Sequence, residues 1–112
     1  MSDSVSEVVA VLAGLAAAQN LRTRAIEGCR LALGNCAEDE TDWLDGWAAE
    51  QLEPRFRSCS FVFDSPIGYP FVDTRLDLYA RERLVGYYRF ITLPGGAFED
   101  EYLVIDVPNP AD

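Results

Sequence analysis

The last third of the chain has the residue pattern of a three-stranded antiparallel meander. In the first run, 71–80, apolar or small side chains alternate with polar ones, which is the period-two pattern of a strand with one buried face. A second run, 84–93, is rich in aromatic and β-branched residues, and Pro94-Gly95-Gly96 separates it from a third run, 98–107. The chain therefore has to build an antiparallel sheet at this end.

Helical patterns precede these strands. Apolar residues recur at helical spacing over 5–16 and again over 21–33, where Gly34-Asn35 predicts the end of the second helix. One unbroken helix over both stretches would be about 43 Å long, which exceeds the diameter of a small domain. We therefore expect a break near Gln19-Asn20.

The middle of the chain predicts a third helix and a first strand. Apolar residues at helical spacing run from Trp43 to Leu52, and Pro54 is expected to end this helix. Cys59–Phe63 is typical of a strand. Helical segments followed by four strands predict one α+β domain over residues 1–112, with N-terminal helices packed on one face of a four-stranded antiparallel sheet. This element order is similar to that of cystatin-like and nuclear-transport-factor-like folds, a likeness that implies no function.

The charge of the chain restricts its partners. Its 19 carboxylates face nine arginines, with no lysine and no histidine, so the formal net charge is −10. Such a surface repels nucleic acid backbones and anionic lipid head groups. We expect no nucleic acid and no membrane partner, and a protein partner with a basic surface; the alternative is that the charge serves solubility alone. The acidic residues Asp3 and Glu7 lie at the N-terminal end of the apolar stretch, where a signal peptide needs positive charge, so a signal peptide is not indicated and we expect a cytoplasmic protein.

The residue types leave little basis for catalysis or metal binding. Without histidine there is no Ser-His-Asp triad, no Cys-His pair and no imidazole metal site. Cys29, Cys36 and Cys59 lack the spacing of a zinc site and are interpreted as free thiols. The acidic residues from Glu38 onward do not fit a calcium-binding loop. Such a loop needs glycine at its sixth position, and the sixth residue counted from Glu38 is Trp43. We expect no enzyme activity, no cofactor and no metal.

The middle strand of the meander is the best candidate for a binding surface. Strict alternation gives it two largely apolar faces, only one of which can pack against the helices of the chain. The other face is either covered by the N-terminal segment or is an interface, since tyrosine and arginine are enriched in interface cores. Gly86 within the strand predicts a bulge or a close backbone approach. One face holds Val85, Tyr87, Arg89, Ile91 and Leu93, and the other holds Leu84, Gly86, Tyr88, Phe90 and Thr92.

Acidic and aromatic residues near the turns complete the candidate site. Two prolines flank the loop that carries Tyr69, and this loop either presents Tyr69 to a partner or tucks it against the core. Glu99, Asp100 and Glu101 begin the last strand, where alternation places Asp100 on the face opposite the other two. The partner-binding residues we predict are Tyr69, Tyr87, Arg89, Glu99, Asp100 and Glu101.

Three hypotheses follow for function. The first is a non-enzymatic interaction domain, of the inhibitor, immunity-protein or adaptor type, that binds a basic protein through its sheet face. The second is a small-molecule-binding or catalytic domain with a pocket between sheet and helices. The third is a homodimer with a structural role. The pocket of the second hypothesis would be lined by Trp43, Trp47, Phe61, Phe63 and Tyr88.

Overall fold

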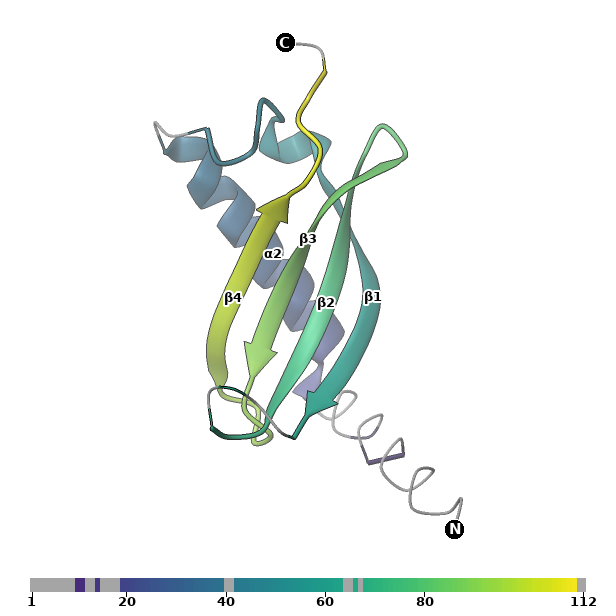
Figure 1. Ribbon diagram of the computed structural model, residues 1–112, viewed down its shortest axis with the longest axis vertical. Helices are drawn as coiled ribbons and strands as arrows, with labels where there is room; N and C mark the ends of the chain where they lie inside the picture. Colours follow the sequence, from purple (N-terminus) through teal and green to yellow (C-terminus); the bar gives the residue numbers. More distant parts are fainter. Residues whose placement is uncertain are drawn as a thin grey trace.

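The computed structural model describes residues 10–11, 14, 19–39, 42–63, 66 and 68–110. The strands form one antiparallel sheet in the order β1-β2-β3-β4, with α2 on one side of it (Figure 1). This arrangement confirms the predicted α+β class and the antiparallel meander. In chain order the elements are α2 (Leu21–Glu38), the 3-10 turn η1 (Ala49–Gln51), β1 (Glu53–Val62), β2 (Phe71–Ala80), β3 (Arg83–Thr92) and β4 (Phe98–Ile105).

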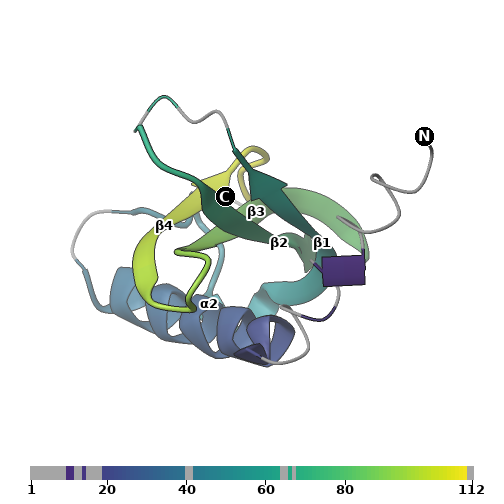
Figure 2. The same cartoon turned by 90° about the horizontal axis from the view of Figure 1, so that it is seen from below.

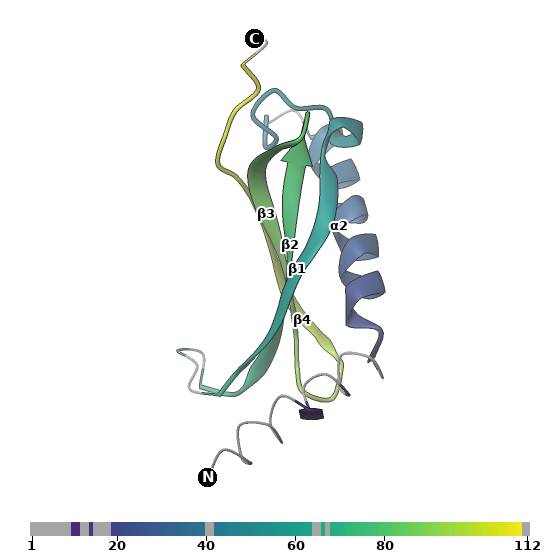
Figure 3. The same ribbon diagram turned by 90° about the vertical axis from the view of Figure 1, so that its right-hand side faces the viewer.

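Helix α2 covers one face of the sheet and shares the core with it. The helix lies diagonally across the strands, and the short η1 lies on the same side, beside the end of α2 (Figures 1, 2 and 3). Its buried stripe meets the apolar face of β2 and β3, as the alternation in the sequence requires. The stripe consists of Leu21, Ala25, Cys29 and Leu33, and the facing sheet residues include Val72, Leu76, Leu78, Tyr88 and Phe90.

Tyr88 lies at the centre of this core. Its side chain is fully buried, and its hydroxyl donates a hydrogen bond to Glu101 Oε1 at 2.9 Å. Gly28 in α2 lets the helix approach at this point, because a Cβ there would lie 2.8 Å from the Tyr88 hydroxyl oxygen. Burial is the main reason that the pKa of Tyr88 is raised, so the phenol stays protonated.

The expected break before the second helix is confirmed at Asn20, which has φ 55° and ψ 41°. The predicted first helix lies mostly outside the described residues. The predicted end at Gly34-Asn35 is wrong, because α2 continues to Glu38. The apolar stripe extends past the glycine to Cys36, which packs against the core, and this packing outweighs the roughly 1 kcal/mol that an interior glycine costs.

The predicted helix from Trp43 to Leu52 is also wrong: only η1 is helical there. Asp45 and Gly46 have positive φ values of 51° and 88°, which an α-helix cannot accommodate. Contacts with the C-terminal segment hold this turn instead, since the Trp47 indole N–H donates to the Val107 carbonyl at 2.8 Å. Leu44 and Trp47 are buried as predicted for their spacing, but in a turn rather than a helix.

Strand β1 begins earlier than the predicted Cys59 and includes Pro54. A proline is tolerated here because β1 is an edge strand. On the side of β1 that has no neighbouring strand, a missing N–H removes no hydrogen bond between strands. Among the described residues, no helix is long and apolar enough to cross a membrane.

Both features predicted for Gly86, a bulge and a close backbone approach, are present. The β2–β3 register shifts between Leu78 and Tyr79, which leaves Val85 as an extra residue in β3. A Cβ on Gly86 would lie 2.1 Å from the Val104 carbonyl oxygen, so β4 approaches closely here. The bulge also corrects the strict alternation, because Val85 joins the core while Leu84 is exposed.

Candidate functional site

The sheet face opposite α2, called the outer face below, carries the candidate site. On this face lie the side chains of β2 and β3 that alternate with the core residues, paired as Asp73 with Ile91, Arg75 with Arg89, and Asp77 with Tyr87. No helix or strand among the described residues covers it (Figure 3). The predicted second apolar face is therefore a mixed face of arginine, tyrosine and aspartate.

Arginine, tyrosine and carboxylate groups combine on this face into a repeated unit. The Arg89 guanidinium lies 5.2 Å from the centre of the Tyr102 ring and donates through Nε to Asp73 Oδ2 at 2.9 Å. Arg75 lies 4.4 Å from the Tyr87 ring and pairs with Asp77. In these two units the ring fixes the guanidinium plane and the carboxylate fixes its direction.

A third unit lies near the other end of the sheet. Arg55 lies 4.2 Å from the centre of the Tyr79 ring and donates to Glu82 at 3.1 Å and to Glu53 at 3.2 Å. Arg57, in the bulge of β1, adds a 3.1 Å hydrogen bond to Asp77. The arginines thus neutralise most of the acids on the outer face.

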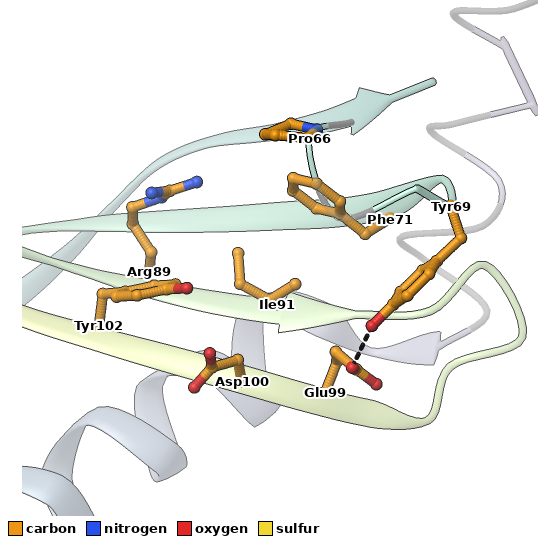
Figure 4. A pocket seen from close by; sticks show the side chains of 8 residues that line it. All are labelled: Pro66, Tyr69, Phe71, Arg89, Ile91, Glu99, Asp100 and Tyr102. Atoms are coloured by element: carbon orange, nitrogen blue, oxygen red, sulfur yellow. Dashed lines mark hydrogen bonds between the residues drawn. The ribbon is translucent and has the colours of Figure 1, made fainter. Parts of the chain in front are cut away.

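A hollow of about 260 Å3 opens in the outer face beside the β1–β2 loop (Figure 4). Ile91 forms its floor: this side chain is only 4% exposed, yet it is not part of the core cluster beneath α2. Tyrosines and acids surround it. The lining residues are Pro66, Tyr69, Phe71, Arg89, Ile91, Glu99, Asp100 and Tyr102.

A third bulge brings two acids into this hollow. The β3–β4 register places Asp100 opposite Ile91 but Phe98 opposite Thr92, which leaves Glu99 as an extra residue. The predicted alternation of the acidic row is therefore wrong at Glu99, which lines the same hollow as Asp100. Glu101 lies on the opposite side of the sheet, where it accepts the Tyr88 hydrogen bond.

A tyrosine hydroxyl holds one of the two carboxylates in place, and a backbone N–H holds the other. The Tyr69 hydroxyl donates to Glu99 Oε1, and this hydrogen bond is the main cause of a raised pKa for Tyr69. Asp100 Oδ1 accepts a hydrogen bond from the backbone N–H of Glu101 at 2.8 Å, and the nearby Asp100 carboxylate raises the pKa of Tyr102. Within the described part of the chain, neither Glu99 nor Asp100 forms a salt bridge with an arginine. The hollow thus combines two fixed carboxylates with aromatic rings.

The structure brings four of the six predicted residues together at the hollow: Tyr69, Arg89, Glu99 and Asp100. Tyr87 lies on the outer face in the neighbouring unit, and Glu101 lies on the α2 side. The sequence prediction missed Tyr102, which stacks beside Arg89 and is 47% exposed. Counting residues from the Pro94–Gly96 turn pairs Tyr102 with Arg89 only when Glu99 is treated as an extra residue. The sequence does not mark Glu99 as extra, so it gives no signal for Tyr102.

The five residues predicted to line a pocket between helix and sheet do not lie together around one pocket. Tyr88 and Trp47 belong to the packed core, whereas Trp43 is 59% exposed and Phe63 is 68% exposed. Trp43 and Trp47 do line a hollow of about 380 Å3, but it lies at the end of α2, beside Cys36 and Asp39. It does not include the other three predicted residues.

The cysteines are free, and their surroundings disfavour the reactive thiolate. Burial raises the pKa of the Cys29 thiol to about 12, and burial also raises the pKa values of Cys36 and Cys59. Over the described ranges, no group of three or more histidine, cysteine or acidic side chains is arranged to hold a metal ion.

Comparisons with known proteins do not identify a family for this chain. No family model, no curated protein and no solved structure matches the chain.

Proposed function

We propose that this protein is a non-enzymatic interaction domain that binds a basic protein partner through its outer face. One observation carries the proposal: the sheet is packed against α2 on one side, while no described element packs against its other side, which is lined with tyrosine and arginine. Both residue types are enriched at interface cores, where tyrosine supplies contact area and arginine supplies directed hydrogen bonds.

The outer face is ordered in advance of binding. Each stacked arginine already has a carboxylate partner, so little side-chain freedom remains to be lost when a partner docks. The extended sheet supports these side chains on its four strands, and a rigid support favours affinity. This is the kind of surface that a protein partner can cover without rearranging it.

Charge favours a basic partner over an acidic one. The net charge of −10 attracts a positively charged protein from a distance, and this attraction raises the association rate at low salt. Among the described residues of the outer face, the acids without an arginine partner are Glu99 and Asp100, which line the hollow. The hollow is therefore the place where a cationic group of the partner gains most.

Affinity capture from the native cell tests this proposal. We compare the wild-type protein with a variant carrying Tyr87→Ala and Tyr102→Ala at roughly 0.05 M and 0.5 M salt. The wild-type protein should retain a basic protein at low salt, and the variant should retain about tenfold less, because aromatic anchors contribute much of the binding energy. High salt should reduce capture through slower association.

A matched control separates the outer face from general stickiness. Leu31→Ala with Trp43→Ala also removes two large exposed side chains, 68% and 59% exposed, from α2 and the loop after it. This control should capture the partner as the wild-type protein does. Equal capture by all three proteins, or capture that is independent of salt, would contradict the proposal. Light scattering on the isolated protein shows whether a second copy is the partner instead.

A further inference from the structure

The hollow contains an incomplete copy of the unit that the outer face repeats. Three times on this face a guanidinium stacks on a tyrosine ring and pairs with a carboxylate. At the hollow, the Tyr69 ring and the carboxylates of Glu99 and Asp100 are present, but no arginine of the described residues stacks on Tyr69 or pairs with these acids. Arg89, the arginine that lines the hollow, is already committed to Tyr102 and Asp73.

We propose that the hollow binds the guanidinium group of an arginine side chain of the partner, between the Tyr69 ring and the carboxylates of Glu99 and Asp100. This inference rests on the proposed function and names the group that the site recognises. Figure 4 shows the geometry: Tyr69 reaches across to Glu99, Asp100 lies next along β4, and Ile91 lies between them and Phe71.

The size of the hollow favours one side chain over a small-molecule ligand. Its volume is about 260 Å3, whereas pockets for drug-sized molecules typically hold roughly 300–1,000 Å3. The apolar floor of Ile91 and Phe71 suits the aliphatic part of an arginine, and the acids lie at the rim on β4. A long side chain with a charged end matches both parts.

The chemistry favours arginine over lysine. A guanidinium is planar, so it can stack on a tyrosine ring while its N–H groups reach two carboxylates at once. An ammonium group is compact and strongly hydrated, and gains less from a flat ring. Hydrogen bonds from the Tyr69 hydroxyl to Glu99 and from the Glu101 backbone N–H to Asp100 hold the two carboxylates before the ligand arrives, which reduces the ordering cost of binding.

A peptide titration followed by NMR tests this inference. The probe is the peptide Gly-Gly-Arg-Gly-Gly, with capped ends, added to the isotopically labelled full chain. Backbone signals of Tyr69, Ile91, Glu99 and Asp100 should shift on titration. A peptide with citrulline in place of arginine has nearly the same shape without the charge and should bind about tenfold more weakly. The lysine peptide should fall between the two.

Paired variants locate the binding and provide the control. Glu99→Gln with Asp100→Asn should weaken binding of the arginine peptide about tenfold, because it removes the two charged acceptors. Glu27→Gln with Glu38→Gln removes the same charge from α2 and should change the affinity less than twofold. Equal weakening by both pairs, equal binding of the citrulline peptide, or shifts confined to another surface would overturn the inference.

The failure of this inference and the failure of the proposed function can be told apart. If the arginine peptide does not bind at the hollow, but partner capture still depends on Tyr87 and Tyr102, the outer face is an interface and the arginine site is wrong. If the peptide binds at the hollow but partner capture does not depend on Tyr87 and Tyr102, the arginine site is supported and the proposal of a wider interface on the outer face is wrong.

Discussion

Replacing Gly86 with alanine should destabilise the protein by about 3 kcal/mol, at the upper end of the usual cost of overpacking. The new Cβ would lie 2.1 Å from the Val104 carbonyl oxygen and 3.1 Å from the Ile105 Cα, and both atoms belong to the backbone of β4. A backbone cannot move aside as a flexible side chain can, so the β3–β4 ladder must open locally. Urea unfolding followed by circular dichroism measures the change in the free energy of unfolding.

Gly95→Ala is the matched control for Gly86→Ala. Gly95 lies in the turn between β3 and β4, and a Cβ there would meet no atom within 4 Å. We expect a change of less than about 0.5 kcal/mol for this exposed position. If Gly86→Ala were as stable as Gly95→Ala, the close approach of β3 and β4 would be disproved.

Tyr88→Ala should destabilise the protein by about 4 kcal/mol, as expected for the loss of a large aromatic ring from a core. The side chain is completely buried between α2 and the sheet, and its removal leaves a cavity beside Gly28 and Cys29. The measurement is again the free energy of unfolding from urea titration. A cost below about 1 kcal/mol would mean that α2 does not pack on this face.

Tyr88→Phe separates the ring from its hydroxyl. Phenylalanine keeps the packing and removes only the 2.9 Å hydrogen bond to Glu101, whose side chain is exposed and can turn to water. We expect a loss of about 1 kcal/mol, the usual net value of a hydrogen bond. A loss equal to that of Tyr88→Ala would instead assign the stability to the hydroxyl.

The sheet could be predicted from the sequence because its signal is local. The alternation in β2 gives the bounds that the structure has, 71–80, and β3 and β4 begin within one residue of the predicted runs. Gly86 could be identified as a bulge or close approach because a glycine interrupts an otherwise β-branched and aromatic run. These patterns depend only on neighbouring residues.

The region between α2 and β1 could not be predicted in the same way. Trp47 is placed by a hydrogen bond to the Val107 carbonyl, 60 residues along the chain, and Asn109 contacts the same turn. The spacing of Leu44 and Trp47 fits a helix equally well, so periodicity alone cannot separate the two. The contact with the C-terminal segment decides the structure.

The candidate site depends on residues that strict alternation misplaces. The bulge at Glu99 turns this residue to the same hollow as Asp100, and it shifts the rest of β4 so that Tyr102 lies beside Arg89. Nothing in the row Glu99-Asp100-Glu101 marks the extra residue. The arginine–tyrosine–carboxylate units could likewise not be predicted from the sequence. Their members come from different strands, and the bulges determine the register of those strands.

Footprinting of aromatic side chains by hydroxyl radicals tests the central claim most directly. In the isolated protein, Tyr69, Tyr102 and Trp43 should all be modified, since they are 40%, 47% and 59% exposed. In extract of the native cell at low salt, Tyr69 and Tyr102 should become protected, while Trp43, which lies off the outer face, should not. Equal modification of the two tyrosines with and without extract would contradict an outer face that binds a protein partner.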